Sequence, residues 1–117
     1  MKIFEIRDTL KADVLTGQEH LDRTVMGGGG ADLMVDVLSA VAEGAAILTG
    51  LVDESVLRTA KIANVACIVF VRGKKPGADF LEQARAYDLP VLSTQYSLFV
   101  ASGRLYMNGL RGLDGSW

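Results

Sequence analysis

The 117-residue sequence has few of the residues from which many catalytic and metal sites are built. It contains one cysteine, Cys67, and one histidine, His20, so it can form neither an internal disulfide nor a conventional structural zinc site. Its 12 basic and 14 acidic residues leave a net charge of −2, which argues against nucleic-acid binding through bulk electrostatics. We therefore expect no metal, no other cofactor and no nucleic-acid partner.

Long apolar runs are also missing. The main one covers residues 66–71 and is far shorter than the roughly 20 residues that a transmembrane helix needs. Residues 1–8 mix charged and apolar side chains and lack the apolar core of a signal peptide. We expect a cytoplasmic protein without membrane contact, and an unpaired cysteine suits a reducing compartment.

Glycine, in contrast, is abundant. Half of the residues are hydrophobic and 22% are charged, which is the composition of one folded globular domain. The 13 glycines make up about 11% of the chain, against about 7% in an average protein. Four of them, Gly27 to Gly30, are consecutive. We divide the chain into a domain at residues 1–107 and a loose glycine-rich C-terminal tail at residues 108–117.

The order of apolar residues predicts alternating helices and strands. Spacings of three and four predict helices over residues 3–10, 32–43, 53–63, 79–87 and 97–105. Short apolar runs predict strands over residues 13–15, 45–48, 66–71 and 89–92. Residues 18–30 are predicted to be a turn-rich loop. Helices and strands in this order predict an α/β fold, a single small three-layer domain with a mostly parallel sheet built from repeated β-α units.

Small or polar residues follow three of these predicted strands, as Thr49-Gly50, Arg72-Gly73 and Ser93-Thr94. In open α/β sheets, ligands bind beyond the carboxyl ends of the strands, where helix N-termini favour anions. Thr49, Gly50, Ser93 and Thr94 are therefore candidate ligand-binding residues. Turn formation and helix capping are the simpler explanation, because every connection from a strand to a helix needs such residues.

The glycine run is the second candidate site. Gly27, Gly28, Gly29 and Gly30 precede a predicted helix, as the glycines of a phosphate-binding loop do. No lysine follows them, and they do not follow a strong strand as a dinucleotide-binding motif requires. A flexible loop is therefore the simpler interpretation, and Arg23 is the nearest cation if the loop binds an anion.

Asp22, Arg23 and Thr24 lie just before the glycines and form a third candidate. An acid, a guanidinium and a hydroxyl in a row can fix a loop through local hydrogen bonds, or can bind a phosphate or a partner's carboxylate. No catalytic set can be assembled from the remaining residues. His20 is predicted to be a solvated loop residue, and Cys67 a small buried hydrophobic residue without a nucleophilic role.

Several of these stretches together resemble the DRTGG domain family. They are residues 15–17, 21–28, 46–50 and 89–94 followed by Tyr96, and the similarity keeps the same order over roughly residues 3–106. The resemblance implies a fold similar to the N-terminal domain of HPr kinase/phosphorylase. It also implies similarity to companion domains beside phosphotransacetylase-like domains and between CBS domains of some pyrophosphatases, where the domain contributes to a dimer contact. Asp22, Arg23 and Thr24 occupy the positions that give the family its name.

The sequence departs from the family pattern at three places. Val25-Met26 separates Thr24 from the glycines. Leu51-Val52 stands where the family often has a charged Asp-Arg pair, and Ser97-Leu98 stands where it often has Asp-Thr. The loss of charge makes this edge of the domain more apolar, which suits protein contact better than a polar ligand. We expect a non-enzymatic regulatory or interaction module that forms a homodimer, with a separate catalytic protein as a further partner. The alternatives are a sensor of a nucleotide or phosphorylated metabolite and, more remotely, a kinase-like enzyme.

Overall fold

The computed structural model of the chain describes residues 1–39 and 42–113. The strands are β1 (Asp13–Thr16), β2 (Gly28–Gly30), β3 (Ala46–Thr49), β4 (Cys67–Phe70) and β5 (Val91–Ser93). The helices are α1 (Ile3–Leu10), the short 3-10 helix η1 (Gln18–His20), α2 (Met34–Ser39), α3 (Glu54–Ala63), α4 (Ala78–Ala86) and α5 (Leu98–Met107). The strands form one sheet in the order β1-β5-β4-β3-β2, in which only β1 runs antiparallel to its neighbour. The predicted α/β domain with a mostly parallel sheet is confirmed.

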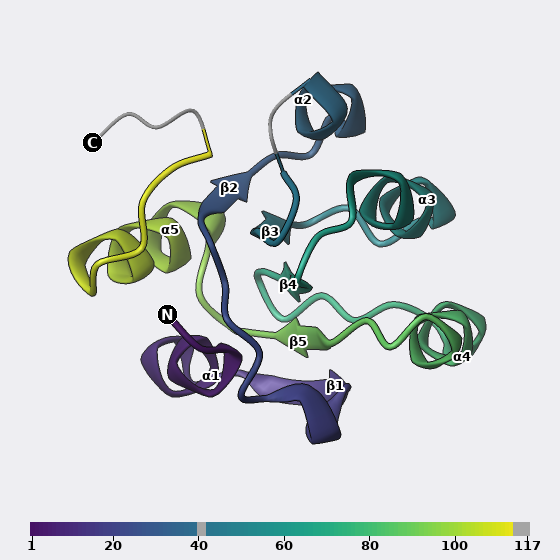
Figure 1. Cartoon of the computed structure of the whole chain (residues 1–117), viewed down its shortest axis with the longest axis horizontal. Coiled ribbons are helices and arrows are strands. Elements are labelled where there is room, and N and C mark those ends of the chain that lie inside the picture. Colours follow the sequence, from purple (N-terminus) through teal and green to yellow (C-terminus); the bar gives the residue numbers. More distant parts are fainter. Residues whose placement is uncertain (40–41, 114–117) are drawn as a thin grey trace.

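Helices cover both faces of the sheet, which gives the predicted three layers. In Figure 1, α2, α3 and α4 lie on one side of the strands, and α1 and α5 lie on the other. Successive strand residues point to opposite faces. Ile68 therefore packs in the core under α2–α4, whereas Val69 packs in the core under α1 and α5. Because both faces of β4 are covered, its sequence is a continuous apolar run.

The predicted helix over residues 32–43 begins later than its sequence suggests. Helix α2 starts at Met34, and residues 40–41 of the prediction lie outside the described residues. Asp32 lies before α2, in the connection that follows β2. Helix α3, by contrast, begins as predicted, because the Asp53 carboxylate caps it by accepting a hydrogen bond from the Ser55 amide at 2.9 Å.

The prediction of a flexible glycine loop is wrong. Gly28–Gly30 form the edge strand β2, with Gly28 opposite Ala46 and Gly30 opposite Leu48. The prediction of a loose tail is also wrong for residues 108–113. Leu110 is buried in the core under α1 and α5, and Gly112 pairs with Gly28 in a short parallel bridge. Residues 114–117 of the tail lie outside the described residues.

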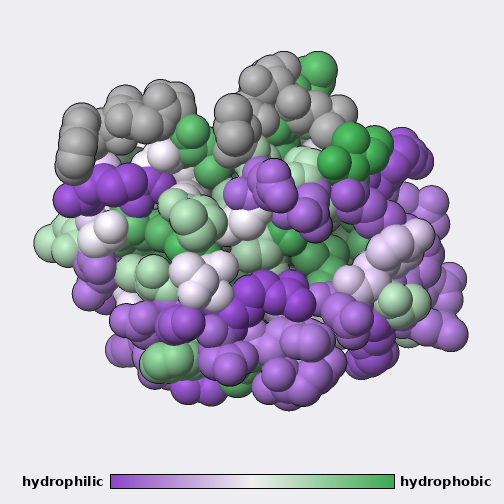
Figure 2. Space-filling view, viewed as in Figure 1, coloured by the Kyte–Doolittle hydropathy of each residue, from purple (hydrophilic) through white to green (hydrophobic). Residues whose placement is uncertain are grey.

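On the face that Figure 2 shows, hydrophilic and hydrophobic residues gather in different regions of the surface. Hydrophilic residues dominate the lower part of this view, and hydrophobic residues are more frequent in its middle. Among the described residues, no helix has the length and apolar character needed to cross a bilayer.

Candidate functional site

The predicted site residues divide between the two ends of the sheet. Arg23 lies at the amino end of β4, where its Nη1 donates a hydrogen bond to the carbonyl of Ala66 at 3.2 Å. Thr49 and Ser93, in contrast, are the last residues of β3 and β5. A four-residue strand spans about 13 Å. Arg23 and Thr49 therefore cannot contact the same small anion, and a single site that combines Arg23, the glycines, Thr49 and Thr94 does not form.

The segment around Asp22, Arg23 and Thr24 holds the start of α1. The Arg23 carbonyl accepts a hydrogen bond from the Ile3 amide at 3.1 Å, and Thr24 Oγ1 accepts one from Lys2 Nζ at 2.9 Å. Asp22 is exposed and makes no hydrogen bond with the described residues through its side chain. The geometry supports local fixing of the loop, although Arg23 binds a backbone carbonyl and not the neighbouring carboxylate.

Asp32, which the sequence pattern assigned only to a helix start, joins the carboxyl ends of β2 and β3. Its Oδ1 accepts hydrogen bonds from the Gly50 amide at 2.9 Å and from Thr49 Oγ1 at 3.0 Å. These two bonds lower the pKa of Asp32 below its ordinary value, outweigh the opposing effect of desolvation, and are assisted by the charge of Arg72. Thr49 and Gly50 therefore both bind the Asp32 carboxylate at this end of the sheet.

Arg72 adds a cation to this end of the sheet. Its backbone has φ = 57°, in the left-handed region that residues other than glycine seldom occupy. The Arg72 guanidinium lies where a Cβ atom at Gly50 would reach, so it packs directly against this glycine. The sequence signal for this contact was the Arg72-Gly73 pair after β4, which by itself indicates only a turn.

Ser93 and Thr94 are buried, and their hydroxyls are used within the fold. Thr94 Oγ1 donates to the carbonyl of Leu10 at 2.7 Å, and Ser93 Oγ donates to the carbonyl of Lys74 at 2.8 Å. Thr94 Oγ1 also accepts a hydrogen bond from the Tyr96 amide at 3.3 Å. The expectation that Ser93 and Thr94 cap the following helix is wrong, because Ser97 caps α5, while Ser93 ends β5. The two residues are only 4% and 1% exposed, respectively.

Hydrophobic side chains flank the polar groups at the carboxyl ends. We call Leu33, Val52, Leu98 and Phe99 the apolar rim. Leu33 follows Asp32 and is 61% exposed, Val52 follows the Gly50 turn and is 39% exposed, and Phe99 at the start of α5 is 88% exposed. Leu98 packs over the backbone of Gly30, which connects α5 to the end of β2. Because the Ser93 and Thr94 hydroxyls are used within the fold, this end offers a partner the apolar rim together with the charged groups of Asp32 and Arg72.

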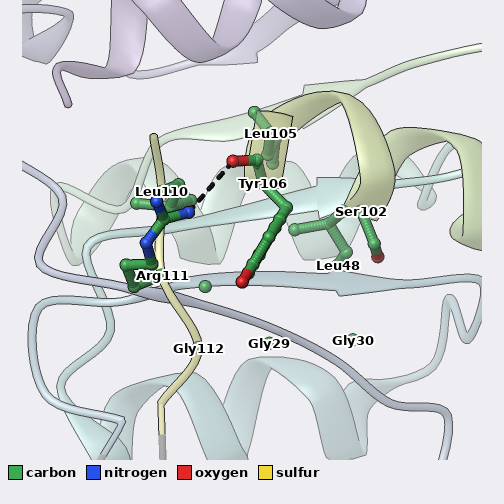
Figure 3. A pocket seen from close by; sticks show the side chains of 10 residues that line it. Gly29, Gly30, Leu48, Ser102, Leu105, Tyr106, Leu110, Arg111 and Gly112 are labelled. Carbon is green, nitrogen blue, oxygen red and sulfur yellow. Dashed lines mark hydrogen bonds between the residues drawn. The ribbon is translucent and has the colours of Figure 1, made fainter. Parts of the chain in front are cut away.

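A cavity of about 160 Å³ lies between β2, the second half of α5 and the C-terminal segment (Figure 3). Its lining consists of Gly28, Gly29, Gly30, Leu48, Ser102, Leu105, Tyr106, Leu110, Arg111 and Gly112. In Figure 3 the Tyr106 side chain extends from α5 toward the glycine strand, with Arg111 beside it. Most of the wall is apolar, with a few polar groups, which is the usual composition of a small-molecule site.

The glycines of β2 allow neighbouring leucines to pack directly on the backbone. A Cβ atom at Gly28 would lie 2.9 Å from Leu110 Cδ2, and one at Gly29 would lie 2.7 Å from Leu113 Cδ1. At Gly30 the nearest atom would be Leu98 Cδ1, at 2.7 Å. The glycine run therefore has a packing explanation that does not involve a phosphate.

The remaining titratable candidates do not extend the site. His20 Nε2 lies 3.4 Å from Glu19 Oε1 and 3.5 Å from Asp88 Oδ1, and these are the one group in the described part of the chain whose atoms could together hold a metal ion. Both carboxylates are largely exposed, as ordinary surface partners of an imidazole are. Cys67 is fully buried as predicted, and burial raises the pKa of its thiol to about 12, so the thiol stays protonated and unreactive.

Comparison with known proteins identifies a family and structures with a similar fold. The model of the DRTGG domain matches residues 5–107. The fold is similar to that of the CBS and DRTGG domains of the regulatory region of Clostridium perfringens pyrophosphatase, solved in complex with its activator, diadenosine tetraphosphate. The TM-score is 0.75 at 19% identity, and the match covers 89% of this chain but only 45% of that chain. A search of curated proteins finds no match.

Proposed function

This chain belongs to the DRTGG domain family, and we propose that it is a non-enzymatic regulatory module that forms a homodimer through its apolar rim. The observation that carries the proposal is the exposure of Phe99, which is 88% accessible at the start of α5, at the same end of the sheet as the exposed Leu33 and Val52. A phenylalanine gains about 1.5–3 kcal/mol when it is fully buried, so an exposed one favours association. An aromatic side chain with aliphatic neighbours is also typical of the residues that dominate protein interfaces.

The chemistry of the described residues supports a module without catalytic activity. The candidate hydroxyls of Ser93 and Thr94 are buried in backbone hydrogen bonds, and the Cys67 thiol is buried and protonated. The glycine run, which could have suggested a phosphate loop and a kinase, is instead paired with β3. A regulatory module needs something to regulate, so we extend the proposal to a catalytic protein as a second partner, in the cytoplasm.

The dimer is tested by measuring molar mass over a range of concentrations with light scattering after size exclusion. We expect the wild-type chain to have twice the monomer mass, and Phe99→Ser to raise the dimer dissociation constant at least tenfold because the aromatic contact is lost. Met107→Ser is the matched control. Met107 is 86% exposed on the same helix, but it lies about 12 Å further along the axis.

Two results would contradict the proposal. One is a wild-type chain that stays monomeric at every concentration. The other is a dimer that Phe99→Ser and Met107→Ser weaken equally, since the apolar rim would then have no special role.

A sensor of a nucleotide or phosphorylated metabolite at the carboxyl ends is the second candidate. The Arg72 guanidinium favours it, whereas the Asp32 carboxylate beside it repels anions. A ligand present at 100 times its dissociation constant should stabilise the chain by about 2.7 kcal/mol. Thermal unfolding with ATP and sugar phosphates tests this candidate, and Arg72→Gln should abolish any shift.

A further inference from the structure

We propose that the cavity beside the glycine strand binds a flat heteroaromatic ring that carries a hydrogen-bond donor next to an acceptor, as the adenine ring does. The cavity adjoins the apolar rim at Gly30, over which Leu98 packs, but none of the four rim residues lines it. It is built from the backbone of β2, the second half of α5 and residues 110–112.

The pairing of β2 leaves the N–H and C=O of Gly30 unused at the edge of the sheet. The Ala46 amide donates to Gly27 and the Ala31 amide donates to Leu48, so residues 27, 29 and 31 face β3. The backbone groups of Gly28 and Gly30 therefore point outward. The Gly28 amide donates to the Arg111 carbonyl at 2.9 Å, but no other group in the described residues pairs with the outward N–H and C=O of Gly30.

These two groups of Gly30 match the edge of a particular kind of ring. The N–H and C=O of one strand residue point in the same direction, so they can bind an acceptor and a donor that lie side by side. The ring nitrogen and exocyclic amino group of adenine have this arrangement. Because Gly30 lines the cavity, a ring held at this edge would place its faces against the cavity walls.

The walls are suited to a flat apolar body. Leu48, Leu105 and Leu110 are buried, and Tyr106 forms a side of the cavity. The Arg111 guanidinium lies 4.6 Å from the Tyr106 ring centroid and donates to the Tyr106 carbonyl at 3.2 Å, so the tyrosine and the arginine fix each other (Figure 3). A ring that enters the cavity would meet an ordered aromatic face and not a mobile side chain.

The size of the cavity limits the ligand to one ring system. An apolar cavity of about 150 Å³ holds a benzene-sized molecule, and this cavity measures about 160 Å³, so one of the two fused rings of adenine would lie inside it and the other in its opening. Ser102 and Tyr106 are exposed and mark its opening, through which substituents of the ring could reach solvent. A Cβ atom at Gly30 would lie 3.5 Å from Ser102 Oγ, so any larger residue in the strand would narrow the space.

The test uses adenine as the probe and two-dimensional NMR of the ¹⁵N-labelled full chain as the readout. Glycine amides are resolved in such spectra, and we expect saturable shifts of Gly29, Gly30 and Tyr106. Unsubstituted purine lacks the amino donor, so it should bind about fivefold more weakly, the effect of one hydrogen bond. The Phe99→Ser variant, which is designed to weaken the dimer, should bind adenine with the same affinity as the wild-type chain.

Two variants locate the site. Ser102→Leu fills the opening and should weaken adenine binding at least tenfold, whereas Gly103→Leu should not change it, because a Cβ atom at Gly103 would have no neighbouring atom within 4 Å. Tyr106→Leu removes the aromatic wall and is the second variant if Ser102→Leu does not fold. Absence of saturable shifts, shifts confined to residues outside the cavity, or equal binding of adenine and purine would overturn the proposal.

Discussion

The Asp32 carboxylate connects two strand ends through hydrogen bonds that depend on its charge. It accepts from the Gly50 amide and from Thr49 Oγ1, and Thr49 Oγ1 in turn accepts from the Leu51 amide at 3.1 Å. Hydrogen bonds to an ionised acceptor are stronger than those between neutral groups. The turn after β3 is therefore held best while Asp32 is ionised.

We predict that Asp32→Asn lowers the free energy of unfolding near neutral pH by less than about 1 kcal/mol, because the site is exposed to solvent. The pKa of Asp32 is lowered from 3.8 in the folded chain. Its stabilising effect is therefore complete well above pH 3.8 and is lost as the pH falls through the lower folded value. Urea unfolding at several pH values should show wild type and variant converging in acid. Asp22→Asn, at an exposed carboxylate without hydrogen bonds to the described residues, is the control, and a difference that persists in acid would contradict the prediction.

At the residue scale, the sequence identified Thr49 and Gly50 but not Asp32, the carboxylate that they bind. Thr49 and Gly50 were recognisable as a polar pair after an apolar strand, and Arg23 as a residue that could fix a loop. Asp32 was missed as a partner of Thr49, because their contact exists only when β2 lies beside β3. Nothing in three consecutive glycines indicates which strand they will join.

Most elements were predictable because their apolar residues repeat with the period of the element. Ile3, Ile6 and Leu10 recur on one face of α1 and are all fully buried. Strand β2 could not be found in this way, since glycine has no side chain that could show a period of two. Its conformation depends on residues far along the chain, Leu98 and Leu110, which pack where its side chains would be.

We predict opposite effects for substitutions at two glycines. Gly28→Val should lower the free energy of unfolding by about 1–3 kcal/mol, because the valine Cβ atom would overlap with the buried side chain of Leu110. This steric cost should outweigh the preference of valine for strands. Gly103→Ala should raise it by about 0.5–1 kcal/mol, since this position lies inside α5 and faces open space. Urea unfolding of both variants measures the difference, and a stabilising Gly28→Val would show that packing against Leu110 does not explain the glycine.

At the scale of the whole molecule, the segments near both ends of the chain pair with residues that are distant in the sequence. Lys2 pairs with Thr24 near the start of the chain, and Gly112 pairs with Gly28 at the β2 edge of the sheet. The family match ends at residue 107, but Leu110 still belongs to the core under α1 and α5. The segment after α5 therefore protects the edge of β2, which an unpaired strand would otherwise expose to other chains.

We predict that a chain ending at Met107 is less stable than the full chain by about 2–5 kcal/mol, the usual effect of removing one large buried side chain. The truncation removes Leu110, which is 7% exposed, and the carbonyl of Arg111 that pairs with the Gly28 amide. Removal of residues 114–117 alone is the control, because it leaves both of these contacts in place. Urea unfolding should show a lower midpoint for the chain that ends at Met107 only. If both truncated chains unfold at the midpoint of the full chain, residues 108–113 do not contribute to the fold, and the domain ends with α5.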